Sequence, residues 1–144
     1  MTKSVSGILP RRAIGELCAS GAIVPARPFD ADQIQPASLD LRLGGWAARV
    51  RASFLPGAQR TVAERLQAIE LHRMPLADGA VLETGCVYIV PLLESLKLPQ
   101  HIAATTNPKS STGRLDVFTR VISDWATAFD QVNAGNMVVK VIYL

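Results

Sequence analysis

The chain has 144 residues, with 15 Lys and Arg against 12 Asp and Glu and a formal net charge of +3. This length accommodates one domain with a sizeable core, and a hydrophobic content of 49% excludes an intrinsically disordered chain. Scattered over the chain, this mild basic excess fits an anionic small ligand as well as it fits nucleic acid. With only 6% aromatic residues a stacking platform for single strands is poorly supported, and no nucleic-acid partner is expected.

The N-terminus lacks the features of a targeting segment. The residues before Arg11 contain no apolar core of a signal peptide. No apolar run of about 18 residues occurs in the sequence, so a membrane-spanning helix is not expected. We therefore expect a cytoplasmic protein with no membrane partner.

The side chains best suited to bind zinc are isolated from one another in the sequence. They are Cys18, His72, Cys86 and His101. None belongs to a C-x-x-C pair or to another spacing typical of zinc sites. We expect core or incidental roles for all of them, and no zinc.

Two segments have the pattern of short helices. From Leu9 to Gly21, Pro10 suits the first turn and Gly21 suits the C-terminal cap. A second helix is expected over Thr61–Glu70, because Thr61 and Glu64 have the spacing of a capping box.

The segment Ser38–Leu43 alternates three polar residues with three leucines, which predicts a half-buried strand. Gly44 and Gly45 follow it, and Trp46–Arg51 could return as its hairpin partner. Asp40 and Arg42 then share the polar face of the strand, where they could pair with neighbouring groups or with another subunit. Ordinary solvated polarity is the favoured interpretation.

The second half of the sequence has the pattern of strands and turns. Ala80–Glu83 and Cys86–Leu93 are rich in strand-forming residues, and Pro91 predicts a bulge or an edge position in the second of them. Ile102–Thr106 leads into a polar loop, and Leu115–Ile122 alternates again.

The last eight residues, 137–144, form an apolar run that ends without a turn or a polar tail. This ending predicts a final strand without a partner, in a chain that lacks the C-terminal part of its domain. We therefore interpret residues 1–144 as one domain that is incomplete at its C-terminus.

These elements together predict a mainly β fold. Short strands, irregular turns and two brief helices are typical of an antiparallel barrel or sandwich. The sequence has no βαβ alternation, and it lacks the Gly-x-x-x-x-Gly-Lys-Ser/Thr spacing of a P-loop.

The segment from Asn107 to Leu115 has the composition of a polyphosphate site. Lys109 supplies a point charge, and the planar fork of Arg114 can bind two phosphate oxygens. Gly113 permits a close backbone approach or a positive φ. Hydroxyl donors come from Ser110, Ser111 and Thr112. A surface turn would have a similar composition, so both interpretations stay open at this point.

Three segments in order resemble the deoxycytidine triphosphate (dCTP) deaminase family of the trimeric dUTPase-like superfamily. They are Gln35–Gly44, Leu93–Pro99 and Lys109–Leu115. The resemblance extends to about Gly135 and is strongest to the longer bacterial forms, in which considerably more chain follows such a unit.

The resemblance implies a distorted antiparallel β-barrel, a homotrimer with shared active sites, and deamination of dCTP to dUTP and ammonia with Mg²⁺ on the triphosphate. By position, Lys109 and Ser111 would contact phosphates, Ser110 would orient the attacking water, and Arg114 would lie near the attacked carbon. Lys109 replaces the commoner Arg, so the cation is kept while the bidentate contact is lost.

The resemblance also identifies what this chain lacks. Zinc deaminases need His-x-Glu with Pro-Cys-x-x-Cys, which does not occur here, so a carboxylate would have to activate the water. In the family that carboxylate is a Glu on a strand after a turn, and the matching position here is Tyr143. A phenol with a pKa of about 10 is a poor base at neutral pH, so this chain is expected to be inactive or nearly so.

Two alternatives remain open from the sequence. One is a dUTP diphosphatase-like hydrolase, because that superfamily shares the serine-rich phosphate loop. It would require an Asp in a hairpin after the loop, and the region from Asp130 to Gly135 does not decide the question. The other is a non-catalytic relative that keeps the fold and some phosphate binding.

Overall fold

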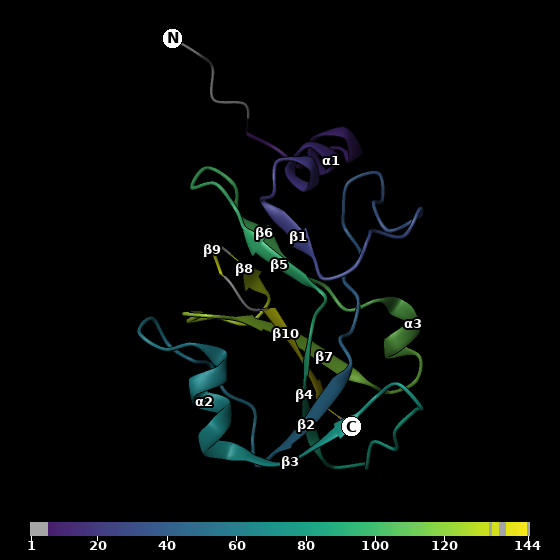
Figure 1. Cartoon of the computed structure of the whole chain (residues 1–144), viewed down its shortest axis with the longest axis vertical. Helices are drawn as coiled ribbons and strands as arrows, with labels where there is room; N and C mark the ends of the chain where they lie inside the picture. Colours follow the sequence, from purple (N-terminus) through teal and green to yellow (C-terminus); the bar gives the residue numbers. More distant parts are fainter. Residues whose placement is uncertain (1–5, 133, 136–137, 144) are drawn as a thin grey trace.

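The computed structural model describes residues 6–132, 134–135 and 138–143. Within these residues the chain forms three helices and ten short strands (Figure 1). The helices are α1 (Arg11–Ala19), α2 (Val62–Ile69) and α3 (Ser110–Gly113). The strands are β1 (Ile23–Pro25), β2 (Trp46–Val50), β3 (Glu70–Pro75), β4 (Val87–Pro91), β5 (Glu94–Lys97), β6 (Ala104–Thr105), β7 (Phe118–Ser123), β8 (Gln131–Val132), β9 (Ala134–Gly135) and β10 (Val138–Tyr143).

The largest sheet has five antiparallel strands in the order β3-β2-β4-β10-β7. Strand β10 lies inside this sheet, with Tyr143 opposite Val87 of β4 on one side and Phe118 of β7 on the other. The expectation of an unpaired final strand is therefore wrong. Its apolar residues suit an interior position, where both backbone edges form hydrogen bonds.

Two smaller antiparallel sheets complete the fold, with the orders β1-β5-β9 and β6-β8. The mainly β, antiparallel prediction is confirmed. The described residues form separate sheets and no closed barrel, so the barrel part of the prediction is not realised within them.

Both predicted helices are present. Helix α1 follows Pro10, and α2 begins with the predicted capping box. The Glu64 N–H donates to the Thr61 hydroxyl over 3.2 Å, and the Thr61 N–H donates to the Glu64 carboxylate over 2.8 Å. The Asp124 carboxylate accepts the Val62 N–H over 2.8 Å, so a residue distant in sequence also caps this helix. Helix α3 was not predicted.

The predicted strand over Ser38–Leu43 is wrong. Its leucines form only isolated bridges, Leu39 with Ile34 and Leu43 with Leu92. Strand β2 does form, but it pairs with β3 and β4 and not with the preceding segment. The alternating leucines are real, yet the polar residues between them bind tertiary partners instead of forming a ladder.

Two further strand predictions need correction. No strand forms over Ala80–Glu83 in the described structure. Pro91 ends β4, an interior strand, and so lies neither at a sheet edge nor in a bulge. Its carbonyl accepts the N–H of Gly44 over 2.6 Å, and a Cβ on Gly44 would lie 2.8 Å from that oxygen. This close approach requires a glycine at position 44.

The core lies along the large sheet and extends to the buried face of α1. Ile89 and Ile122, on β4 and β7, are fully buried with Val62 and Leu66 of α2. A second cluster joins α1 to the small sheets; its buried members are Ile14, Ile23, Leu96, Leu98, Val121 and Val132. Among the described helices, none has the length and apolar character needed to cross a bilayer.

Candidate phosphate-binding site

The predicted phosphate segment folds as a single helical turn, α3, at the surface beside the start of the β7 region (Figure 1). Lys109 precedes the turn in an extended conformation, and Arg114 closes it. The Thr112 N–H donates to the Lys109 carbonyl over 3.0 Å, and the Arg114 N–H donates to the Ser110 carbonyl over 3.0 Å. The two cations therefore stand at opposite ends of one turn of hydroxyl residues.

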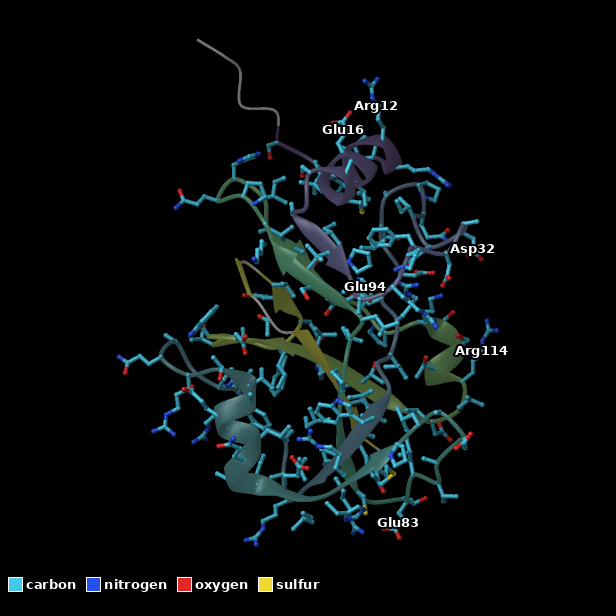
Figure 2. The ribbon with its side chains drawn as sticks, in the orientation of Figure 1. Arg12, Glu16, Asp32, Glu83, Glu94 and Arg114 are labelled. Atoms are coloured by element: carbon cyan, nitrogen blue, oxygen red, sulfur yellow. The ribbon has the colours of Figure 1, made fainter. Side chains whose placement is uncertain are left out.

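Most of this segment is open to solvent. Thr112 is half-buried, and the other five residues from Lys109 to Arg114 are exposed. Figure 2 shows Arg114 directed outward from α3. A Cβ added to Gly113 would meet no atom within 4 Å, and this glycine does not take a positive φ, so that part of its expected role is wrong. Asp116 has the positive φ instead, at 57°.

Lys109 has a specific partner from the first sequence motif. Its Nζ lies 2.7 Å from Oδ2 of Asp40, with the Lys109 side chain 62% exposed and that of Asp40 31% exposed. Asp40 was expected on a solvated strand face, and this expectation is wrong. The ion pair joins the segment before β2 to the proposed phosphate segment.

The main chain of Asp40 is fixed by Gln33, which is buried. The Asp40 N–H donates to the Gln33 carbonyl over 3.0 Å. The Gln33 amide donates to the Asp40 carbonyl over 2.9 Å and to the Glu94 carboxylate over 2.7 Å. The position of Asp40 therefore depends on a buried polar network.

Glu94 is the centre of that network, and its side chain is fully buried. Besides the Gln33 amide, it accepts the Arg42 N–H over 2.9 Å and the Arg42 Nε–H over 2.8 Å. Figure 2 shows Glu94 in the interior, on β5, between the loop before β2 and the small sheet. A buried carboxylate with three donors is a structural anchor, since burial without them would be costly.

The other Arg42 nitrogens hold the preceding loop. Nη1 donates to the Pro28 carbonyl over 2.8 Å, and Nη2 donates to the Arg27 carbonyl over 3.0 Å. Oδ2 of Asp30 lies 3.6 Å from Nη1. The Arg42 side chain is only 11% exposed. The interpretation of Arg42 as ordinary solvated strand polarity is therefore wrong.

Asp130, in the region that a dUTP diphosphatase would use, is also held in structural bonds. Its carboxylate accepts the Thr106 hydroxyl over 3.0 Å, the Val121 N–H over 2.9 Å and Arg120 Nη1 over 2.6 Å. Its φ is 60°. These contacts connect β7 to the loop before β8, so the carboxylate of Asp130 has a structural role.

The structure gives less information on the remaining predictions. Tyr143 occupies an interior strand, and its side chain lies outside the described part. The described residues contain no group of three or more His, Cys, Asp or Glu side chains that could hold a metal ion. The roles given to Lys109, Ser110, Ser111, Thr112, Gly113 and Arg114 stay predictions.

Comparison with known proteins identifies the family. The model of the 2'-deoxycytidine 5'-triphosphate deaminase N-terminal domain matches residues 5–141. The chain belongs to this family. A crystal structure of the dCTP deaminase from Agrobacterium tumefaciens superposes with a TM-score of 0.91 at 54% identity, over 95% of this chain and 42% of that one. The dUTPase-like fold expected from the sequence is thereby confirmed.

Curated members of the deaminase family agree with this assignment. The "dCTP deaminase, dUMP-forming" of Methanoculleus marisnigri is 33% identical over 104 residues, covering 70% of this chain and 52% of the relative. The "dCTP deaminase" of Halorubrum lacusprofundi is 30% identical over 118 residues, covering 81% and 56%. This chain thus spans about half the length of these relatives. The dUTP diphosphatase alternative is not favoured.

Asp40 and Gln33 were missed as contributors to the site, whereas Glu94 has the structural role that its place in a family motif suggested. Glu94 and Asp40 lie in two of the three family motifs, which was the signal available. The sequence could not show that these two motifs meet, because Arg42 and Gln33 bind Glu94 only in the folded chain.

Proposed function

We propose that this chain is a nucleotide-binding unit of a dCTP deaminase, a hydrolase of pyrimidine deoxynucleotide metabolism that converts dCTP to dUTP and ammonia. The observation that carries the proposal is the exposed turn from Lys109 to Arg114, with a cation at each end and three hydroxyl residues between, on the fold of this family.

The turn suits a triphosphate for chemical reasons. The Arg114 guanidinium can donate two parallel hydrogen bonds to phosphate oxygens, and the Lys109 ammonium adds a charged donor. Ser111 and Thr112 supply hydroxyl donors. Gly113 has open space around it, so a phosphate can approach its backbone.

The deamination adds water to the amino-bearing carbon of cytosine and releases ammonia. In our proposal Ser110 orients the water and Arg114 lies near the attacked carbon. A base must accept the water proton and pass one to the leaving ammonia. Tyr143 occupies the position of the family's carboxylate, so we propose that these 144 residues bind nucleotide but contribute little base catalysis.

Mg²⁺ is proposed only as a companion of the triphosphate. No cluster of three candidate ligands exists among the described residues, and a triphosphate supplies oxygen ligands of its own. Mg²⁺ commonly binds through substrate phosphates while retaining several waters. When bound, it would offset phosphate charge, and the residues of this chain would act on the remaining oxygens.

We further propose a homotrimer with shared sites, as the family resemblance implies. Analytical ultracentrifugation with and without dCTP tests this directly. A species of three chains is expected. A monomer at all concentrations and ligand levels would contradict it.

Titration calorimetry tests the nucleotide proposal. We expect dCTP and inorganic triphosphate to bind, and uncharged deoxycytidine to bind far more weakly, because the triphosphate contacts dominate. Binding of deoxycytidine as tight as that of dCTP would contradict a phosphate site at this turn. An activity assay that separates dUTP, dUMP and diphosphate would show whether this chain forms the product named for the Methanoculleus relative.

A further inference from the structure

We infer that Asp40 is the resident counter-ion of Lys109, and that buried Glu94 is the residue that positions it. Asp40 pairs with the cation that the proposed function assigns to phosphate, and an incoming triphosphate takes the place of its carboxylate. This inference rests on the proposed phosphate site, but its first test requires no ligand.

The contact differs from an ordinary surface ion pair in one respect. Arg12 and Glu16 on α1 also pair, but both side chains are largely exposed, at 91% and 67%. Asp40 is 31% exposed, and Gln33 binds both its N–H and its carbonyl. One partner of the Lys109 pair is thus held in place, while the other has a flexible stem.

Glu94 controls this position from the interior. Its carboxylate binds the Gln33 amide that holds Asp40 and the Arg42 N–H two residues further along the chain. Arg42 in turn is fixed by carbonyls of residues 27 and 28. Loss of the Glu94 contacts would free the segment that carries Asp40, while leaving Lys109 untouched.

The charge of Asp40 opposes binding of an anion at Lys109. A carboxylate next to the ammonium neutralises it and repels phosphate oxygens, and this repulsion is stronger than the benefit of holding one exposed lysine in place. The charge on a triphosphate is several times that of one carboxylate, so it can displace Asp40 from the ammonium. Asp40 therefore lowers the affinity of the site for all anions.

The first test measures the chemical reactivity of Lys109 by mass spectrometry after brief acetylation of the folded chain. Lys97 is exposed on β5 and serves as the internal reference. Asp40→Asn should increase the Lys109 rate severalfold relative to Lys97, and Asp40→Glu, which keeps the charge, should restore protection. Asp32→Asn is the matched control, since Asp32 is an exposed carboxylate of the same region. Equal Lys109 rates in Asp40→Asn and the parent chain would overturn the inference.

The second test uses inorganic triphosphate in titration calorimetry at low salt. Asp40→Asn should tighten binding about 3–30-fold, and this gain should vanish in the Lys109→Met background, whereas Asp32→Asn should change little. A gain of equal size with Lys109→Met would mean that Asp40 acts through the general field and would overturn the pairing role. If triphosphate binds to none of the variants, the proposed function fails, and the acetylation result still decides the Asp40–Lys109 pair.

The positioning role of Glu94 has its own measurement. Glu94→Gln should increase Lys109 acetylation and should add nothing in the Asp40→Asn background. Because this change leaves Arg42 partly unpaired and could unfold the chain, Gln33→Leu serves as a second variant that keeps the Arg42–Glu94 pair. If a folded Gln33→Leu or Glu94→Gln chain keeps Lys109 as protected as in the parent, Glu94 does not position Asp40.

Discussion

The carboxylate of Asp40 lies 2.7 Å from the Nζ of Lys109, and this contact joins the first and third family motifs of the chain. Asp40 is held by a buried network around Glu94, which lies in the second motif. The three motifs therefore meet in the folded structure through side chains. This arrangement connects the interior of the fold to the surface turn that we propose as the phosphate site.

The buried pair Arg42–Glu94 should be far more important for stability than the exposed pair Arg12–Glu16. Glu94→Ala leaves Arg42 without its carboxylate in an environment where its side chain is 11% exposed. We expect a loss of about 3–5 kcal/mol in the free energy of unfolding. For Glu16→Ala, a change of no more than about 0.5 kcal/mol is expected. Urea unfolding of both variants provides the comparison, and similar losses would contradict the anchor role of Glu94.

The contribution of the α2 capping box to the free energy of unfolding should be measurable with one substitution. Thr61→Ala removes the acceptor of the Glu64 N–H and should lower the free energy of unfolding by about 1 kcal/mol. Thr127→Ala, at an exposed position in the loop before β8, is the control and should have little effect. Equal stability of the two variants in chemical denaturation would show that Asp124 alone caps the helix.

Glu70 should give stability a small dependence on pH. Its hydrogen bonds to Arg73 lower the pKa of the Glu70 carboxyl from its ordinary value of 4.5. A folded pKa below the unfolded one stabilises the fold above the ordinary value, and this contribution is lost as pH falls through the lowered pKa. Solvent exposure of Arg73 limits the effect to under about 1 kcal/mol.

The measurement for Glu70 is the free energy of unfolding from about pH 7 down to about pH 3, for the parent chain and Glu70→Gln. The stability difference between them should be largest at neutral pH and should shrink on acidification. A difference that stays constant over this range would mean that the Arg73 contact contributes nothing through charge.

The absence of a carboxylate at position 143 should limit catalysis. General acid–base catalysis typically contributes about 10²–10⁴-fold, so the purified 144-residue chain should turn over dCTP far more slowly than an ordinary enzyme. Release of ammonia and dUTP in the presence of Mg²⁺ is the readout. Turnover of about 1 per second or more would show that another group serves as the base.

Elements that depend on residues close together in the sequence were predicted best. The capping box at Thr61 and Glu64 predicted α2 almost to the residue, because both partners lie within one helical turn. Strand β7 was anticipated only in part. The alternation holds where Thr119 and Val121 are buried and Phe118 and Arg120 are exposed, but the predicted residues 115–117 form no strand and Ile122, expected on the Arg120 face, is buried.

Contacts and strand pairing between segments distant in the sequence were predicted less well. The leucines of Ser38–Leu43 alternate as in a strand, but Arg42 binds buried Glu94 on β5 and so the segment forms no ladder. The pairing of β10 with β4 and β7 depends on strands remote in sequence. For the same reason the phosphate turn was proposed from Lys109 and Arg114, while its partner Asp40 was taken for surface polarity.

The most direct test of the phosphate site compares dCTP binding by the parent chain, Arg114→Ala and Arg12→Ala in titration calorimetry. Arg12 is an exposed arginine on α1 and controls for the loss of one positive charge. We expect Arg114→Ala to lose about 1.5–3 kcal/mol of binding free energy, which corresponds to an affinity lower by about 10–150-fold, while Arg12→Ala stays within about threefold of the parent. Equal dCTP affinities for the parent and Arg114→Ala, with binding detectable in both, would contradict the assignment of the phosphate site to this turn.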